Sequence, residues 1–299
     1  MTVLIDPPFW PAHGTVFSHL VSDATLDELH AFAKAAGIPE RAFDGDHYDV
    51  AERHFERLVA AGAVSVSGKE LARRLAASGL RIPARERPDK ILPALRDRWA
   101  RLLPQEPGLG ESLLERWGEP HRHYHSRVHL LNVLEALDLL LPDAGLPADR
   151  QRGLLLAAWF HDAVYRGVPG QDEEDSAVLA ETTLHSLPAT ERADVARLVR
   201  VTADHAPGPD DIAAQLLCDA DLSVLAWPAP RYARYLRAVR ADYAHVPDPD
   251  FARGRAAVVA QLLSLNPLFH SPRARSLWLG KAQANLRSEL SGFERTSDA

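Results

Sequence analysis

The stretch LLLAAWFHDAVY, residues 154–165, decides the fold expected for most of this chain. Its first seven residues, Leu154 to Phe160, are apolar on every side of a helix, which predicts a helix at the centre of a bundle. The run is far shorter than the roughly 20 residues that a helix needs to cross a bilayer. His161 and Asp162 follow it directly, and an isolated carboxylate buried among apolar helices costs several kcal/mol. The pair therefore needs polar partners, and a divalent metal ion is one natural partner.

Helical patterns continue on both sides of this stretch. Apolar residues at helical spacing, or runs of helix-favouring residues, mark segments that Gly and Pro separate. These segments are 91–103, 110–117, 126–141, 149–164, 173–187, 190–206, 211–217, 231–245, 250–263 and 272–290. Since no convincing strand pattern follows residue 90, we expect residues 91–299 to form one all-α domain.

The first 80 residues have a different sequence pattern, in which short β-prone segments alternate with helical ones. The expected strands are 2–5, 16–21 and 63–66, and the expected helices are 25–36, 49–61 and 67–78. Ser67 and Glu70 form a capping-box pattern at the start of the last helix. This alternation predicts a small α/β domain over residues 1–80, joined by a polar linker over 81–90. The expected fold class is therefore mainly α, with a small N-terminal α/β domain before an all-α helical bundle.

The composition limits the class of protein. Hydrophobic residues make up 46% of the 299 residues and charged residues 25%, so the chain has enough apolar side chains for a folded core. Its formal net charge of −7 gives no bulk attraction for nucleic acid or anionic membranes. The single cysteine, Cys218, excludes a disulfide framework, and the start MTVLIDPPFW lacks the apolar core of a signal peptide. We therefore expect a cytoplasmic protein with neither a membrane nor a nucleic acid as partner.

Histidines and aspartates recur at informative positions in the helical part. His125 and His129 are four residues apart, a spacing that places both on one face if they share a helix. Together with the pair His161-Asp162, His129 and Asp221 would supply ligands from separate helices. Imidazole and carboxylate groups are common ligands of divalent transition metals. The ordered set therefore predicts a metal site in the helical bundle.

These motifs resemble those of the HD-domain metal-dependent phosphohydrolases, and the resemblance covers about residues 118–290. Within that superfamily the chain looks closest to a bacterial group of uncharacterised predicted phosphohydrolases. The strings that carry this likeness are Arg122-x-Tyr124-His125-x-x-x-His129 and the acidic run Asp172 to Ala177. The resemblance implies a metal-binding quartet of His129, His161, Asp162 and Asp221, with Asp219 left open as an alternative to Asp221.

Two strings are also similar to the class I cyclic-nucleotide phosphodiesterases. Tyr124 to His129 resembles their Tyr-His-Asn-x-x-His, with Ser126 in the asparagine position. Asp221-Leu222-Ser223 resembles their Asp-Leu-Ser segment. The likeness implies that His125 protonates the leaving group and that His129 binds metal. The departure at Ser126 affects fine positioning and leaves the metal set intact.

The expected reaction is hydrolysis of a small phosphomonoester or phosphodiester, nucleotide-like, by a metal-activated water. The metal is Mn, Fe, Zn, Ni, Co or Mg, at one or two ions per chain. Asp162 would bridge a second metal or hold the water. Arg122 and Arg127 are candidate phosphate donors. The remaining candidates for the site are Tyr124, Glu173, Glu174 and His205, the last for a second metal or for phosphate.

Two other functions stay open at this point. Some HD proteins hold two irons and use dioxygen, which makes an HD-type di-iron oxygenase one alternative. A non-catalytic nucleotide-sensing module is the other. A homodimer through the long helices also stays open.

The first 80 residues resemble a domain of unknown function, DUF4031-like, that is often found beside HD domains. The strings that carry this likeness include Val3 to Pro8, Ser18-His19-Leu20 and Asp46 to Asp49. Asp6 ends an expected strand, where α/β folds commonly place site residues. The polar residues that can converge near it are His13, His19, Asp44, His47 and Asp49. They predict a second polar or metal site, with capping of turns as the alternative.

Overall fold

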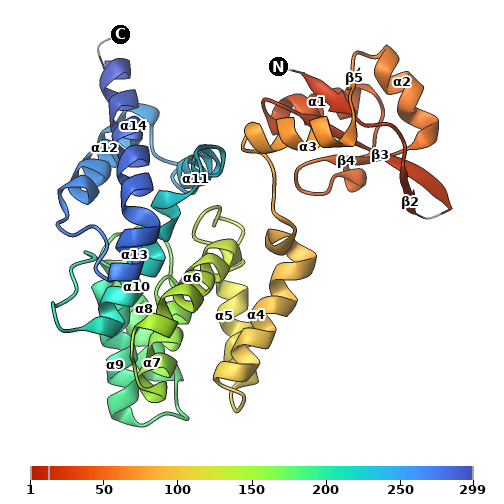
Figure 1. The fold of residues 1–299 in the computed structure, drawn as a ribbon. Coiled ribbons are helices and arrows are strands. Elements are labelled where there is room, and N and C mark those ends of the chain that lie inside the picture. Colours follow the sequence, from red (N-terminus) through yellow and green to blue (C-terminus); the bar gives the residue numbers. More distant parts are fainter. Residues whose placement is uncertain (1, 13, 298–299) are drawn as a thin grey trace. The chain divides into compact units, whose positions relative to one another are not determined.

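The computed structural model describes residues 2–12 and 14–297, and the chain divides into two compact units. The first unit comprises Met1–Arg87 and Ala229–Arg234, and the second comprises Pro88–Pro228 and Tyr235–Ala299. Figure 1 shows strands only in the red N-terminal part and helices in the rest of the chain. The expected fold class, mainly α with a small N-terminal α/β part, is confirmed.

The first unit is built on a small mixed sheet. Its strands are β1 (Val3–Ile5), β2 (Trp10–Ala12), β3 (Thr15–Ser22), β4 (Tyr48–Ala51) and β5 (Val64–Ser65). β3 pairs antiparallel with β1, β2 and β4, and β1 pairs parallel with β5. The expectation of a helix over 49–61 is wrong at its start, because β4 occupies 48–51 and the helix α2 covers only Phe55–Ala60.

Helices cover both faces of this sheet. Ile5 and Leu20 pack with residues of α1 (Leu26–Ala35) and α2, whereas their neighbours Leu4 and Val21 pack with α3 (Gly68–Ala77). Successive residues of a strand point to opposite faces, so two core clusters form from the same strands. The predicted cap of α3 is present, since the Ser67 side chain accepts from the backbone N–H of Glu70.

The second unit is helical throughout its described residues. Its first helices are α4 (Pro88–Leu102), α5 (Pro107–Arg116), α6 (Arg127–Leu140), α7 (Ala148–Phe160), α8 (Gln171–Thr183) and α9 (Ala189–Val201). They are followed by α10 (Ile212–Asp221), α12 (Asp248–Ser264), α13 (Pro272–Ala274) and α14 (Gly280–Ser297). Helix α11 (Ala229–Asp242) is divided between the units, with Ala229–Arg234 in the first and the rest in the second. The segment expected as a linker, 81–90, contains a 3₁₀ turn at Ala84–Glu86 and the start of α4.

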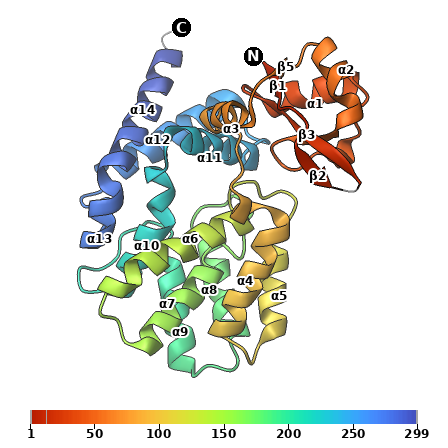
Figure 2. The same cartoon turned by 45° about the vertical axis from the view of Figure 1, so that its right-hand side comes forward.

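Helix α7 is the central helix that its sequence predicts. It packs against α6, α9 and α10, and Figure 2 shows it among them. Its residues from Leu156 to Phe160 are all buried. Trp117 donates from its indole N–H to the carbonyl oxygen of Trp159 and ties the end of α7 to the residue after α5. His161 and Asp162 therefore follow the buried C-terminal half of α7.

Across the described residues, no single helix has the length and apolar character required to cross a membrane. One bent pair of helical segments, Ile212–Ala226 with Ala229–Asp242, passes the same test of length and composition when taken together.

Candidate metal centre

Four side chains from three helices meet in the second unit. His129 lies in the first turn of α6, and Asp221 is the last residue of α10. His161 and Asp162 directly follow α7. We call these four residues the His–Asp centre. They are the quartet that the family resemblance implies.

The donor atoms of the His–Asp centre face one another. The Nε2 atom of His129 is 3.0 Å from Nε2 of His161 and 3.0 Å from Oδ1 of Asp221. The Oδ2 atom of Asp162 is 3.6 Å from Nε2 of His129 and 3.3 Å from Nε2 of His161. Nε2 of His161 and Oδ1 of Asp221 are 3.6 Å apart. Five pairs of donor atoms thus lie between 3.0 and 3.6 Å apart.

These spacings fit the ligands of one metal ion. Donors about 2.0–2.2 Å from an ion are about 3.0–3.5 Å apart at tetrahedral or octahedral angles. Nδ1 of His161 lies 2.8 Å from the carbonyl oxygen of Ala158, and only a protonated nitrogen can donate there. With Nδ1 committed to this carbonyl oxygen, Nε2 is the nitrogen of the His161 ring that faces the cluster and could bind an ion. Two imidazoles and two carboxylates suit a divalent transition metal.

The charges in the His–Asp centre also suit a cation. Burial opposes ionisation of Asp221, but hydrogen bonds from the imidazoles outweigh it and hold its pKa well below the usual value. Burial opposes ionisation of Asp162 too, yet the charge of His161 keeps that pKa low. For His129, burial is the larger effect and lowers the pKa, so the ring stays neutral and offers a lone pair. Two ionised carboxylates in a buried cluster attract a divalent cation.

His205 extends the cluster beyond Asp221. Its Nε2 lies 2.8 Å from Oδ2 of Asp221, whereas Oδ1 faces His129 and His161. The expected helix over 190–206 ends earlier, because α9 stops at Val201 and His205 lies in the following loop. His205 has a φ of 52°, a left-handed conformation that non-glycine residues seldom adopt and that concentrates at functional sites.

His125 is held by a carboxylate that sequence reasoning missed. Its Nδ1 lies 2.7 Å from Oδ2 of Asp242, at the end of α11. The same buried carboxylate accepts the backbone N–H groups of His123, Tyr124 and His125. The ring of His125 stacks on Tyr165, with centroids 4.1 Å apart. The ring is therefore fixed in orientation, and Nε2 is the nitrogen available for chemistry.

A cavity of about 320 Å³ lies beside the His–Asp centre. The predicted site residues that line it are Tyr124, His125, Asp162, Glu173, His205 and Asp221. Burial raises the pKa of Tyr124 and of Glu173. Arg255, which the sequence analysis did not single out, also lines the cavity and pairs with Glu289 at 2.7 Å. No local motif marks Arg255 or Asp242, because both reach the site through the tertiary fold.

Three residues that the sequence analysis assigned to the site do not line the cavity. The guanidinium of Arg127 donates to the carbonyl oxygen of Leu114, and Glu174 pairs with Arg200. Arg122 is buried and donates to the carbonyl oxygens of Asp162 and Ala163 at 2.6 and 3.1 Å. None of the three is among the residues that line the cavity. Arg122 positions the backbone that carries Asp162.

Replacing Arg122 with methionine is expected to lower the free energy of unfolding by about 2–4 kcal/mol. The reason is that hydrogen bonds from a charged donor contribute about 1.5–3 kcal/mol each, and the bonded carbonyls would lose their partner. Urea unfolding followed by circular dichroism measures the change. Arg101→Met, at an exposed position on α4, is the control and should stay within about 0.5 kcal/mol. If Arg122→Met is as stable as the unaltered protein but binds phosphate more weakly, Arg122 contacts the phosphate, as the sequence analysis expected, and does not support the backbone.

The neighbouring Asp219 faces away from the His–Asp centre. Its carboxylate accepts the backbone N–H groups of His270 and Ser271, at 2.6 and 2.7 Å. Asp219 and Asp221 both lie on α10, but the structure brings only Asp221 to the two imidazoles.

The thiol of Cys218 is expected to be inert in the folded protein. Burial, followed by the negative charges of Asp221 and Asp219, raises its pKa far above the usual value. Since the thiolate is the reactive form, we expect native protein to react with a disulfide reagent at least about 100-fold more slowly than protein unfolded in guanidinium. Equal rates at mildly alkaline pH would contradict the burial of this side chain.

The first unit contains a separate group of histidines and aspartates. Asp6, His19 and His47 lie close together on and beside the sheet, as the sequence predicts, and Asp49 joins them. Asp44 instead pairs with Arg87.

Residues 3–78 match a family model described as a protein of unknown function (DUF4031). The match confirms the DUF4031 resemblance of the N-terminal residues. No curated protein matches the chain. The DUF4031 match ends before α4, so the His–Asp centre lies outside it. Of the predicted residues in the DUF4031 region, His13 lies outside the described residues.

Proposed function

We propose that the second unit is an HD-type metal-dependent phosphohydrolase that cleaves a small phosphomonoester or phosphodiester, nucleotide-like. The observation that carries this proposal is the convergence of the His–Asp centre beside a cavity that His125 also lines. The ligands come in the order that the family resemblance implies, and each comes from the end of a helix. A cluster with a purely structural role needs no cavity. The cavity beside these residues therefore favours hydrolysis over a structural role.

Different residues of the site would take different roles in the reaction. A divalent cation at the His–Asp centre would lower the pKa of a coordinated water and neutralise charge on the phosphoryl oxygens. The attacking water would lose one proton to solvent, and as its oxygen bonds to phosphorus the bond from phosphorus to the leaving oxygen breaks. His125 donates the proton that the leaving oxygen needs, from Nε2, because Nδ1 is committed to Asp242.

The cavity supports a small substrate. Its volume of about 320 Å³ lies at the lower end of the range for ligand pockets, about 300–1,000 Å³. Arg255 also lines the cavity, where its guanidinium is ion-paired with Glu289. Tyr124 keeps its proton at neutral pH, because burial raises its pKa, and so it can donate a hydrogen bond.

The test combines elemental analysis of the purified chain with a screen for phosphate release. The screen covers nucleotides, cyclic nucleotides and sugar phosphates, with Mn²⁺, Fe²⁺, Zn²⁺, Ni²⁺, Co²⁺ and Mg²⁺ supplied in turn. We expect bound transition metal and cleavage of at least one ester class. Two irons with dioxygen consumption and no ester cleavage would replace the proposal with oxygenase chemistry. Absence of metal after supplementation would leave a nucleotide-sensing module.

A further inference from the structure

A second group of possible metal ligands lies in the first unit, on and beside strands β3 and β4. The antiparallel register places His19 directly opposite Asp49, and His47 lies two residues before Asp49. Directly opposed residues of paired strands point to the same face, so His19 and Asp49 share one face of the sheet, and His47 lies in the bend just before β4. The rings of His19 and His47 meet edge to face, with centroids 5.0 Å apart.

Each of the two imidazoles is oriented by a buried carboxylate. Nδ1 of His19 lies 3.0 Å from Oδ2 of Asp6, whose Oδ1 accepts the backbone N–H of His19. Nδ1 of His47 lies 2.6 Å from Oδ1 of Asp46, a side chain with no exposed surface. Metal-binding histidines characteristically donate their second ring nitrogen to such a carboxylate, which leaves the first nitrogen free for the ion.

The Nε2 atoms of both rings turn toward Asp49. Oδ1 of Asp49 is 3.4 Å from Nε2 of His47 and 3.9 Å from Nε2 of His19. The three donor atoms lie within 4.8 Å of one another. The Asp49 side chain is 47% exposed, so it has room to close these distances around an ion. Asp6 and Asp49 bring two carboxylates to the imidazoles, whereas the charge of Asp46 is shared with Arg81 and Arg87, each 3.7 Å away.

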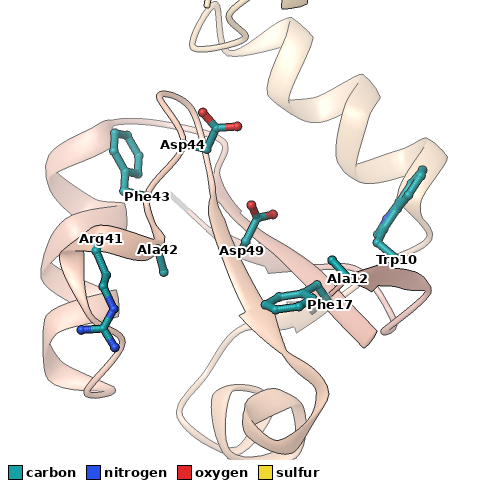
Figure 3. Close-up of a pocket in the computed structure, with 8 residues that line it drawn as sticks. All are labelled: Trp10, Ala12, Phe17, Arg41, Ala42, Phe43, Asp44 and Asp49. Carbon is teal, nitrogen blue, oxygen red and sulfur yellow. The ribbon is translucent and has the colours of Figure 1, made fainter. Parts of the chain in front are cut away.

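The exposed side of the group opens on a cavity. Asp49 lines a hollow of about 510 Å³ together with Trp10, Phe17, Arg41 and others (Figure 3). In Figure 3 its carboxylate lies on β4 between the rings of Phe43 and Trp10. Of the three candidate ligands, Asp49 lines this cavity and His19 and His47 do not, so water or a further ligand would reach an ion from the side of Asp49. Three protein ligands leave a coordination position open for it, as in catalytic zinc sites.

We propose that His19, His47 and Asp49 bind a divalent transition-metal ion of the Zn²⁺ class, with Asp6 and Asp46 as positioning residues and an open coordination side toward the cavity of Figure 3. This site shares no residue with the His–Asp centre, and the proposal does not depend on the function proposed for that centre. It assigns the DUF4031 region a metal-binding role.

Titration of the full chain with Co²⁺, followed by its visible absorption and by elemental analysis, tests the proposal. We expect Asp49→Asn and His47→Ala to bind one Co²⁺ fewer per chain than the unaltered protein. Asp6→Asn keeps all three ligands but removes the acceptor of the His19 ring, so the affinity of one Co²⁺ should fall by about 10–100-fold. His54→Ala, in the same unit but outside the group, is the matched control and should bind the same amount as the unaltered protein.

The two metal sites can be separated by a second measurement. A chain with His161→Ala and Asp221→Ala should still bind one Co²⁺, and adding Asp49→Asn should abolish it. Asp49 is half-exposed and asparagine matches its shape, so this variant is expected to fold, which circular dichroism verifies. Identical Co²⁺ stoichiometry and affinity in the unaltered, Asp49→Asn and His47→Ala proteins would overturn the proposal, whatever the His–Asp centre does.

Discussion

Asp221→Ala is expected to lower phosphate ester hydrolysis by at least about 1,000-fold and to remove the metal from the His–Asp centre. Both oxygens of this carboxylate are used, since Oδ1 faces His129 and His161 and Oδ2 faces His205. A metal ion contributes several kcal/mol to a phosphoryl transfer step, and about 1.4 kcal/mol corresponds to a tenfold change in rate. His161→Ala should behave in the same way, because its Nε2 lies within 3.6 Å of three other donor atoms.

The measurement pairs metal content with the rate of ester cleavage on the substrate found in the screen. His185→Ala is the matched control, because His185 is an exposed histidine of the same unit that does not line the cavity. Asp219→Asn separates the two acids of α10. It should lose stability, because its carboxylate caps two backbone N–H groups, yet retain the metal. Retention of metal and rate by Asp221→Ala would refute the assignment of the centre.

Metal removal by a chelator should also destabilise the protein. Ligand that binds only the folded state adds about 2.7 kcal/mol at a concentration 100 times its dissociation constant. Without the ion, Asp162 and Asp221 remain as two buried carboxylates around His129 and His161. The midpoint of thermal unfolding should therefore fall on chelation, and should fall less in Asp221→Ala.

The helical part of the fold was predictable because its signals are long and local. The all-apolar run before His161 extends over two turns of α7, and its burial, complete except at the partly buried Leu155, follows directly from the sequence. Strand β4 was not predictable in the same way. It is four residues long, and an alternation of buried Tyr48 and Val50 around exposed Asp49 is too short to outweigh the helical residues that follow.

The candidate site also contains residues with a local sequence signal and residues without one. His129, His161 and Asp221 were predicted because each belongs to a recognisable local string. The inference that His125 and His129 share a helix face is wrong, because α6 begins at Arg127 and leaves His125 in the preceding loop. Asp242, which lies 117 residues further along the chain, replaces the helix as the support for His125. A contact across that separation depends on how α11 packs, which no local pattern encodes.

His125→Ala is expected to slow ester cleavage by about 100- to 10,000-fold, the range for loss of a general acid. Its metal content should stay unchanged, because the ring binds Asp242 and stacks on Tyr165 and is not a member of the His–Asp centre. This separation distinguishes the proton donor from the ligands. Loss of the metal in His125→Ala would place His125 among the ligands instead.

Asp242→Asn tests how the protein positions that acid. Burial alone would raise the pKa of Asp242, but the hydrogen bond and charge of His125, with the backbone N–H groups, hold it below the usual value of 3.8. The carboxylate is therefore ionised across the neutral range and fixes the His125 ring through Nδ1. Asp242→Asn should slow ester cleavage and leave the metal content unchanged, because the amide holds the ring less firmly than the charged carboxylate does.

The same substitution has a stability signature with a defined sign. A carboxylate whose pKa is lower in the folded state adds stability above its unfolded pKa, and this contribution disappears as the pH falls through the folded value. The difference in free energy of unfolding between Asp242→Asn and the unaltered protein should therefore reach its full size at neutral pH. It should become smaller below about pH 4. An unchanged rate of ester cleavage together with a pH-independent stability loss would show that Asp242 acts only as a cap for the backbone around Tyr124.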